Sequence, residues 1–134
     1  MKGFCLCGAV TITAPDNTHL SACHCGMCRR WSGGPALAFH GGPDIEIDGE
    51  DKISRFPSSE WAERAFCSCC GTHLYYKLLA TGDHYLYPGF FGDDQTFTLT
   101  GQIYIDMKPP FYEFANETEN LTEAQVLARF APPA

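Results

Sequence analysis

The eight cysteines of this 134-residue chain fall into three tight groups, and this grouping limits the possible folds more than any other feature. The groups read CLC at residues 5–7, CHCGMC at residues 23–28 and CSCC at residues 67–70. Cysteines two positions apart are too close to satisfy the geometry of a disulfide comfortably. Thiolates at two- and three-residue spacing suit the tetrahedral shell of zinc, although four of them can also hold an iron–sulfur cluster. The sequence therefore predicts a zinc protein.

Charge and composition exclude several classes of function. The formal net charge is −7, whereas a nucleic-acid or anionic-lipid surface requires a basic partner. No apolar run is long enough to span a bilayer, and the first residues lack the apolar block of a secretory signal. We therefore expect a cytoplasmic protein with neither a nucleic-acid nor a membrane partner. A reducing compartment keeps thiols free, which again favours metal binding over disulfides.

The hydrophobic pattern is mostly that of strands. Apolar and polar residues alternate over residues 10–14, 45–48, 74–78, 97–99 and 103–105. Turn signals such as Gly41-Gly42-Pro43 separate these runs. Short strands with frequent turns predict a mainly β domain built from antiparallel sheets.

One helix is predicted, close to the C-terminus in the run LTEAQVLARFA. Thr122 is placed to cap it, with Gln125 closing a capping box, and the run ends before Pro132-Pro133. Leu121 and Val126 have the spacing of a hydrophobic staple. The polar residues 116–120 read as a linker. We therefore expect a zinc-binding domain over residues 1–115, followed by a linker and a short helix at 116–134 that packs on it.

Two of the cysteine groups have the form of metal knuckles. Each ends in a glycine, Gly8 or Gly71, and glycine permits the positive φ that a tight turn around a metal needs. Two such pairs, brought together by strand pairing, form a closed shell that has no room for substrate. The sequence thus predicts a structural zinc with four ligands, which are Cys5, Cys7, Cys67 and Cys70.

The remaining group, Cys23, Cys25 and Cys28, predicts a different kind of site. Three protein ligands leave a fourth position for water or an incoming thiol, which is typical of reactive zinc. The alternative is a second closed site whose fourth ligand is Cys69, His24 or His40. Cys69 is equally consistent with a buried thiol that packs as a small hydrophobe.

The three groups together resemble a known family. The stretches GFCLCGAV, CHCGMCRRWSGG and FCSCCGTHLYY are similar to the CxCG, CxxCR and FCxxCG pattern of glutathione-dependent formaldehyde-activating enzymes, whose family includes the centromere protein V domain. The resemblance covers residues 3–76 and continues more weakly into KPPFYEF at 108–114. It implies a β-tent fold of twisted antiparallel sheets. It also implies two zinc ions, with Cys23, Cys25 and Cys28 as the catalytic centre where glutathione acts.

The reaction that the resemblance implies joins formaldehyde to glutathione, which makes the protein a carbon–sulfur lyase working in reverse. Arg29 and Arg30 directly follow Cys28, so they are the expected substrate-binding residues for the carboxylates of glutathione. Alternatively, Arg30 braces an acidic segment at residues 44–51. Two functions follow as hypotheses: a zinc enzyme that handles adducts of a small thiol with a small aldehyde, or a zinc-stabilised binding module without catalysis. The sequence does not predict an oligomeric state.

Overall fold

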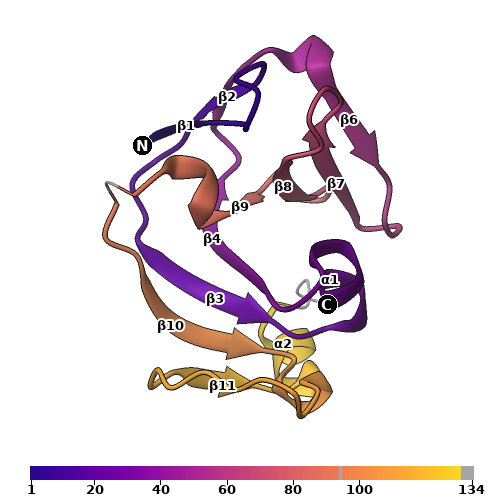
Figure 1. Ribbon diagram of the computed structural model, residues 1–134. Helices are drawn as coiled ribbons and strands as arrows, with labels where there is room; N and C mark the ends of the chain where they lie inside the picture. Colours follow the sequence, from indigo (N-terminus) through magenta and orange to yellow (C-terminus); the bar gives the residue numbers. More distant parts are fainter. Residues whose placement is uncertain (94, 131–134) are drawn as a thin grey trace. The chain divides into compact units, whose positions relative to one another are not determined.

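The computed structural model describes residues 1–93 and 95–130, and most of its regular structure is β-strand (Figure 1). The strands are β1 Lys2–Phe4, β2 Thr11–Thr13, β3 His19–Cys23, β4 Ala36–Gly42, β5 Glu46–Asp48, β6 Ile53–Phe56, β7 Ala62–Cys67, β8 His73–Leu78, β9 His84–Leu86, β10 Thr98–Ile103 and β11 Glu119–Leu121. The α-helices are α1 Gly26–Ser32 and α2 Glu123–Phe130, and the 3₁₀ helices are η1 Glu50–Lys52, η2 Pro88–Phe91 and η3 Ile105–Met107. The prediction of a mainly β fold with a short C-terminal helix is confirmed.

The chain forms two compact units, and each combines segments that are far apart in the sequence. The first unit comprises Met1–Thr18 and Ala38–Thr96, and the second comprises His19–Leu37 with the segment that begins at Phe97. In the first unit, β1, β2 and β5 form one antiparallel sheet, and β4, β9, β8, β7 and β6 follow one another in a second antiparallel arrangement. Its core is apolar and aromatic, with fully or almost fully buried Val10, Ile12, Phe39, Leu74 and Leu86.

The second unit departs from the antiparallel expectation. Strand β10 runs parallel to both of its neighbours, β3 and β11, which lie on either side of it (Figure 1). Parallel strands need a long crossover between them, and here η3 and the loop after it separate β10 from β11. Alternation of apolar and polar residues indicates which face of a strand is buried, but it does not indicate whether neighbouring strands are parallel or antiparallel. The parallel pairing of β10 could therefore not be predicted from this pattern.

The expectation of a separate strand at residues 103–105 is wrong. β10 continues to Ile103, and Tyr104 then adopts left-handed backbone angles, φ 54° and ψ 42°, before η3 begins. Among the described residues, Tyr104 is the only non-glycine residue with a positive φ. Such a conformation interrupts the strand, which is why the apolar alternation across this position does not continue as β structure.

The capping box predicted for the C-terminal helix is confirmed. The backbone N–H of Gln125 donates to the Thr122 hydroxyl at 3.2 Å, and the backbone N–H of Thr122 donates to Gln125 Oε1 at 2.8 Å. The last two residues of the expected linker at 116–120, however, belong to β11, which pairs with β10. The division of the chain at residue 115 stays a prediction. The proline run at 132–133, before which the helix was expected to end, lies outside the described residues.

Candidate metal centres and the adjoining pocket

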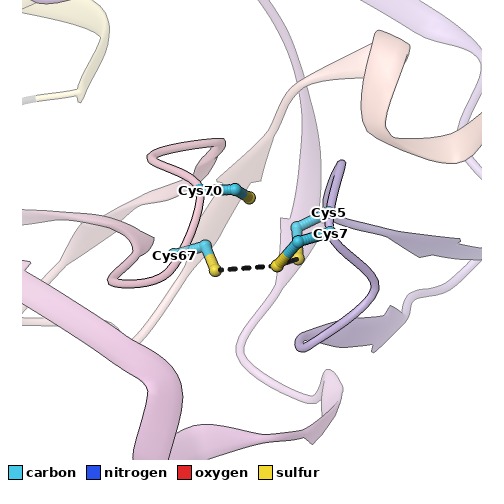
Figure 2. Close-up of side chains that lie close together, drawn as sticks. All are labelled: Cys5, Cys7, Cys67 and Cys70. Carbon is cyan, nitrogen blue, oxygen red and sulfur yellow. Dashed lines mark hydrogen bonds between the residues drawn. The ribbon is translucent and has the colours of Figure 1, made fainter.

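Four cysteine sulfurs converge in the first unit, as Figure 2 shows. Cys5 and Cys7 come from the turn after β1, whereas Cys67 is the last residue of β7 and Cys70 lies in the turn that follows it. The Sγ atoms of Cys5 and Cys7 are 3.6 Å apart, and those of Cys7 and Cys67 are 3.8 Å apart. Sulfurs around a tetrahedral zinc with bonds of about 2.3 Å lie roughly 3.8 Å from one another, whereas a disulfide requires about 2.05 Å. The group therefore fits a four-coordinate metal ion.

Both turns are built as the trailing glycines suggested. The N–H of Gly8 donates to the carbonyl of Cys5 at 2.9 Å, and the N–H of Gly71 donates to the carbonyl of Cys67 at 2.8 Å. Gly8 has φ 80° and Gly71 has φ 78°, which a residue with a Cβ adopts only at a cost. The Val10 N–H also points at the Cys5 sulfur, at 3.3 Å. Backbone geometry thus presents both pairs of thiols to one point.

Thr72 connects the two turns, and sequence reasoning missed it. Its hydroxyl accepts from the Leu6 N–H at 3.1 Å and lies 3.1 Å from the Cys70 sulfur. Hydrogen bonds from the Thr72 hydroxyl and N–H lower the pKa of Cys70 to about 5. The Ala9 amide favours the Cys7 thiolate, but hydrogen bonding with Cys70 and desolvation together raise the pKa of Cys7 to about 12. The four sulfurs therefore share protons, which a bound dication would displace.

The second group, Cys23, Cys25 and Cys28, is assembled from a single short stretch. Cys23 ends β3, Cys25 is the N-cap of α1, and Cys28 lies in the first turn of that helix. Their sulfurs lie within 4.8 Å of one another. The N–H of Cys28 donates to the Cys25 sulfur at 3.4 Å, so a sulfur serves here as the helix cap. Neither a cysteine at the N-cap nor a glycine in the first position is typical of a helix start. The α1 helix was therefore not predicted from the sequence.

The thiols of this group differ in their proton affinity. Hydrogen bonds from Cys23 and Cys28 lower the pKa of Cys25 to about 2. The same contacts raise the pKa of Cys23 well above its ordinary value, and burial adds to the effect. Cys25 is therefore the sulfur that carries negative charge most readily, and its neighbours donate protons toward it.

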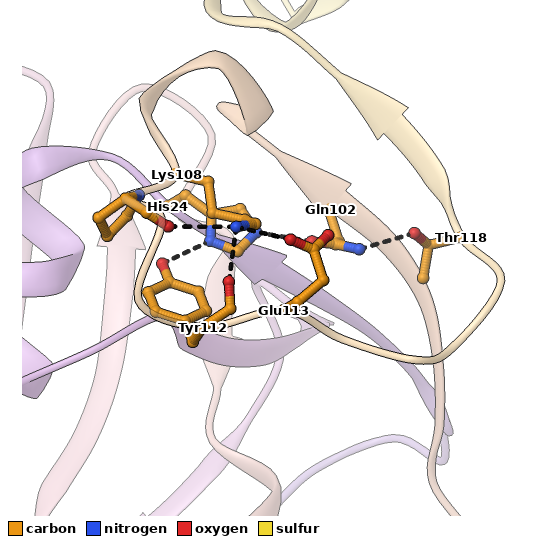
Figure 3. A network of polar contacts seen from close by, with 7 residues as sticks. His24, Gln102, Lys108, Tyr112, Glu113 and Thr118 are labelled. Atoms are coloured by element: carbon orange, nitrogen blue, oxygen red, sulfur yellow. Dashed lines mark hydrogen bonds and ion pairs between the residues drawn. The ribbon is translucent and has the colours of Figure 1, made fainter.

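His24, between two of these cysteines, is fully buried and is not a metal ligand. Its Nδ1 lies 2.7 Å from the Tyr112 hydroxyl, and its Nε2 lies 2.8 Å from Gln102 Oε1 (Figure 3). The Gln102 amide nitrogen donates to the Thr118 hydroxyl at 2.9 Å, so its oxygen accepts from His24 Nε2–H and Nδ1 accepts from the tyrosine. Desolvation lowers the pKa of His24 and keeps the ring neutral. Both ring nitrogens are occupied, so the alternative with His24 as fourth ligand is wrong.

The described residues give the second group no fourth ligand. The set of His, Cys, Asp and Glu atoms that gather within 4.8 Å here consists of the three cysteines. Cys69 is exposed, so its interpretation as a buried hydrophobic thiol is also wrong. In the described part of the second unit, the three sulfurs thus gather without another metal-binding side chain among them.

A pocket lined in part by α1 contains both predicted substrate-binding arginines. It measures about 370 Å³ and is lined by Gly26, Arg29, Arg30, Gly33, Gly34 and Phe111. Arg29 is held in place because its Nε donates to the carbonyl of His24 at 2.8 Å. Neither arginine takes part in an ion pair within residues 1–93 and 95–130, so no contact supports the bracing role considered for Arg30. The two guanidinium groups are available to an anionic ligand.

Tyr104 is a second residue that the sequence did not single out. Its neighbour Ile103 pairs with Cys23 in the β10–β3 ladder. Burial raises the pKa of Tyr104, and the charges of Cys23 and Cys25 raise it further, so the phenol keeps its proton near the thiolates. A non-glycine residue in the left-handed region is strained, and such strain is frequent at functional sites. No sequence signal identifies a tyrosine with this conformation.

The fold and the two cysteine groups together define a class of mainly β proteins with two cysteine clusters that could hold metal ions. The family model described as glutathione-dependent formaldehyde-activating enzyme matches residues 1–107, and the chain therefore belongs to this family, as the three cysteine motifs predicted. The chain is 34% identical over 128 residues to an uncharacterized lyase of Schizosaccharomyces pombe, covering 94% of this chain and 93% of that relative.

A solved structure supports the fold assignment independently. A Rhodobacter sphaeroides protein, determined as a structural genomics target, matches with a TM-score of 0.60 at 24% identity. The match covers 71% of this chain and 91% of the Rhodobacter chain. None of the helices within the described residues is long and apolar enough to cross a membrane.

Proposed function

We propose that this protein is a zinc-dependent, carbon–sulfur lyase-like enzyme that handles the adduct of glutathione, or a similar small thiol, with formaldehyde or another small aldehyde. One observation carries the proposal: three converging sulfurs, which no fourth metal-binding side chain joins within the described residues, come from the same stretch of chain, residues 23–34, as a pocket lined by two arginines. Membership of a family named for glutathione and formaldehyde, and a relative named as a lyase, support it. The reaction would take place in the cytoplasm, where such thiols are abundant and reduced.

The donor sets suit zinc, because all seven candidate ligands are sulfurs that, in each group, lie within 4.8 Å of one another. Cys5, Cys7, Cys67 and Cys70 would hold a structural ion, and the other three cysteines would hold a second ion with an open position. A bound zinc supplies positive charge that favours a thiolate over a thiol at neutral pH. Two zinc ions per chain are therefore part of the proposal.

The arginines would bind and orient the thiol substrate. A guanidinium group binds a carboxylate through two parallel hydrogen bonds, and glutathione carries two carboxylates. Arg29 is already held by the His24 carbonyl, which limits the entropy lost when it binds a ligand. Gly26 lies between Cys25 and Cys28 in the sequence and also lines the pocket, so the pocket and the cysteine group share one short stretch of chain.

In the proposed reaction, the substrate sulfur attacks the carbonyl carbon of the aldehyde. The new carbon–sulfur bond forms as the carbonyl π electrons move to oxygen, and that oxygen takes up the proton that the thiol released. The product with formaldehyde is S-(hydroxymethyl)glutathione, and the reverse sequence of bond changes is the lyase reaction.

Exchange spectroscopy by NMR with ¹³C-formaldehyde and glutathione tests the proposal, because it measures adduct formation at equilibrium. The zinc-loaded protein should raise the exchange rate above the spontaneous rate in proportion to its concentration. Arg30→Gln should raise the KM for glutathione about tenfold, which is the loss of one charged hydrogen-bonding pair. Lys52→Gln, at an exposed cation in the first unit, is the matched control and should leave the rate unchanged.

An exchange rate equal to the spontaneous one, with both metal sites filled, would overturn the enzymatic proposal. Binding of glutathione without rate acceleration would instead support the zinc-stabilised binding module. The two results are separable because binding is measured by calorimetry on the same zinc-loaded sample.

A further inference from the structure

We propose that Phe111 determines substrate specificity by stacking on an amide plane of a peptide thiol while the neighbouring arginines bind its carboxylate. This inference rests on the proposed function and names the part of the substrate that the enzyme recognises. It assigns a role to a residue outside the cysteine motifs, in the loop between η3 and β11. It also explains why that loop is tied down by buried polar groups.

Phe111 is the aromatic residue of the arginine-lined pocket. Its side chain is 77% exposed, yet it lines the same pocket as Arg29 and Arg30. An exposed aromatic ring and two guanidinium groups thus line one space, which suits a ligand that has both an apolar plane and an anionic group. The adjacent glycines, Gly33 and Gly34, have no atoms within 4 Å of where a Cβ would lie, which leaves room for a ligand backbone.

Lys108 holds the loop that carries Phe111. Its side chain is 11% exposed, and its ammonium donates to the carbonyls of Pro109 at 3.1 Å and Tyr112 at 2.6 Å. It also pairs with the Glu113 carboxylate at 2.9 Å, as Figure 3 shows. An ammonium has three protons, and these three oxygens use all of them. Lys108 is therefore a positioning residue for the loop and is not available to bind substrate.

Tyr112 connects the loop to the cysteine stretch through His24. The two rings stack with centroids 5.5 Å apart and planes inclined by 25°, in addition to the 2.7 Å hydrogen bond. The Phe111 ring lies 5.1 Å from the Tyr112 ring. The carbonyl of the same His24 accepts from Arg29. Phe111 and Arg29 are thus both positioned from one buried histidine, which fixes the spacing between the aromatic and the cationic parts of the pocket.

This spacing suits a particular chemical class. The guanidinium groups require an anion, and the flat, apolar ring of Phe111 suits a planar group without charge. In glutathione, amide planes lie between each carboxylate and the thiol. A small carboxylic thiol such as 3-mercaptopropionate has the anion and the sulfur but no amide. Phe111 should therefore contribute to the binding of the peptide thiol alone.

Calorimetric titration of the zinc-loaded protein with glutathione and with 3-mercaptopropionate tests the inference. Phe111→Ala should weaken glutathione binding about tenfold and change 3-mercaptopropionate binding less than about twofold, whereas Phe111→Trp should retain glutathione binding. Phe56→Ala, which removes another exposed ring from the first unit, is the control and should change neither affinity. Equal losses for both thiols, or no loss for either, would overturn the role of Phe111.

Tyr112→Phe tests the positioning role because it removes only the hydroxyl that contacts His24. The expected result is a KM for glutathione raised about threefold with kcat unchanged, since the aromatic packing remains while the hydrogen bond is lost. A fall in kcat without a change in KM would contradict it. If the wild-type protein binds neither thiol, the proposed function itself is wrong, whereas glutathione binding that does not depend on Phe111 overturns this inference alone.

Discussion

The two cysteine groups consist of the same side chain, but they differ in how each group is built. The four-sulfur group joins turns whose Cys7 and Cys67 are 60 residues apart, and Cys5 and Cys67 are fully buried. The three-sulfur group comes from residues 23–28 alone, and its members are half-buried. A metal in the first group would close a long loop, whereas a metal in the second would close only a short one.

The group whose cysteines are far apart in the sequence has four sulfurs, whereas the group from one short stretch has three. Bringing distant segments together stabilises the fold, and a saturated shell serves that purpose because it gives up no ligand position. A short stretch needs no metal to be held together, since the Cys25 sulfur already caps α1 through the Cys28 N–H. An unfilled ligand position in the second group would therefore cause no loss of stability to the fold. The two groups should therefore differ in their effect on stability, in metal release and in backbone strain.

The largest effect is expected when the four-sulfur group loses a member. Cys67→Ser should remove one metal equivalent and lower the thermal midpoint by more than about 10 °C, because the two turns of the first unit are no longer joined. Cys25→Ser should also remove one metal equivalent but shift the midpoint by only about 2 °C. Metal analysis and circular dichroism measure both. Cys69→Ser, at the exposed spare thiol, is the control, and equal midpoint shifts for Cys67→Ser and Cys25→Ser would remove the distinction between the groups.

A chelator should separate the groups by rate. We expect the metal of the half-buried three-sulfur group to leave at least about tenfold faster than that of the four-sulfur group, because an open position admits the competing ligand. Release is followed with a coloured zinc indicator under non-denaturing conditions. Added glutathione should change the fast phase and leave the slow phase unaltered. A single release phase for two equivalents of metal would contradict the open site.

The smallest effect is expected from the glycines. Gly71→Ala should destabilise the protein by about 1 kcal/mol, because φ is 78° there and no atom lies within 4 Å to add a clash. Gly26→Ala, in the three-sulfur stretch, should instead stabilise by about 0.5 kcal/mol, because it begins a helix with ordinary backbone angles. Denaturant unfolding of the zinc-loaded variants measures both. Shifts of the same sign would mean that the two turns do not differ in backbone strain.

Much of this protein could be predicted from local sequence. The knuckle glycines, the Thr122–Gln125 capping box and the mainly β pattern depend on residues within a few positions of one another, and each was found as expected. The family followed from three short motifs in the right order. Cysteine spacing also predicted which thiols gather, although their roles as ligands remain predictions.

The remaining features could not be predicted because they depend on partners far along the chain. His24 forms hydrogen bonds with Tyr112 and Gln102, which are 88 and 78 residues away, and no local sequence pattern predicts these contacts. The parallel direction of β10, the left-handed Tyr104 and the place of Phe111 beside the arginines are of the same kind. The sequence by itself determined the ligand types, the tight turns and the family, because these depend on side-chain chemistry and local backbone freedom. Only the tertiary structure decided which ring nitrogens were occupied and which aromatic faces the pocket, because packing between distant segments fixes those contacts.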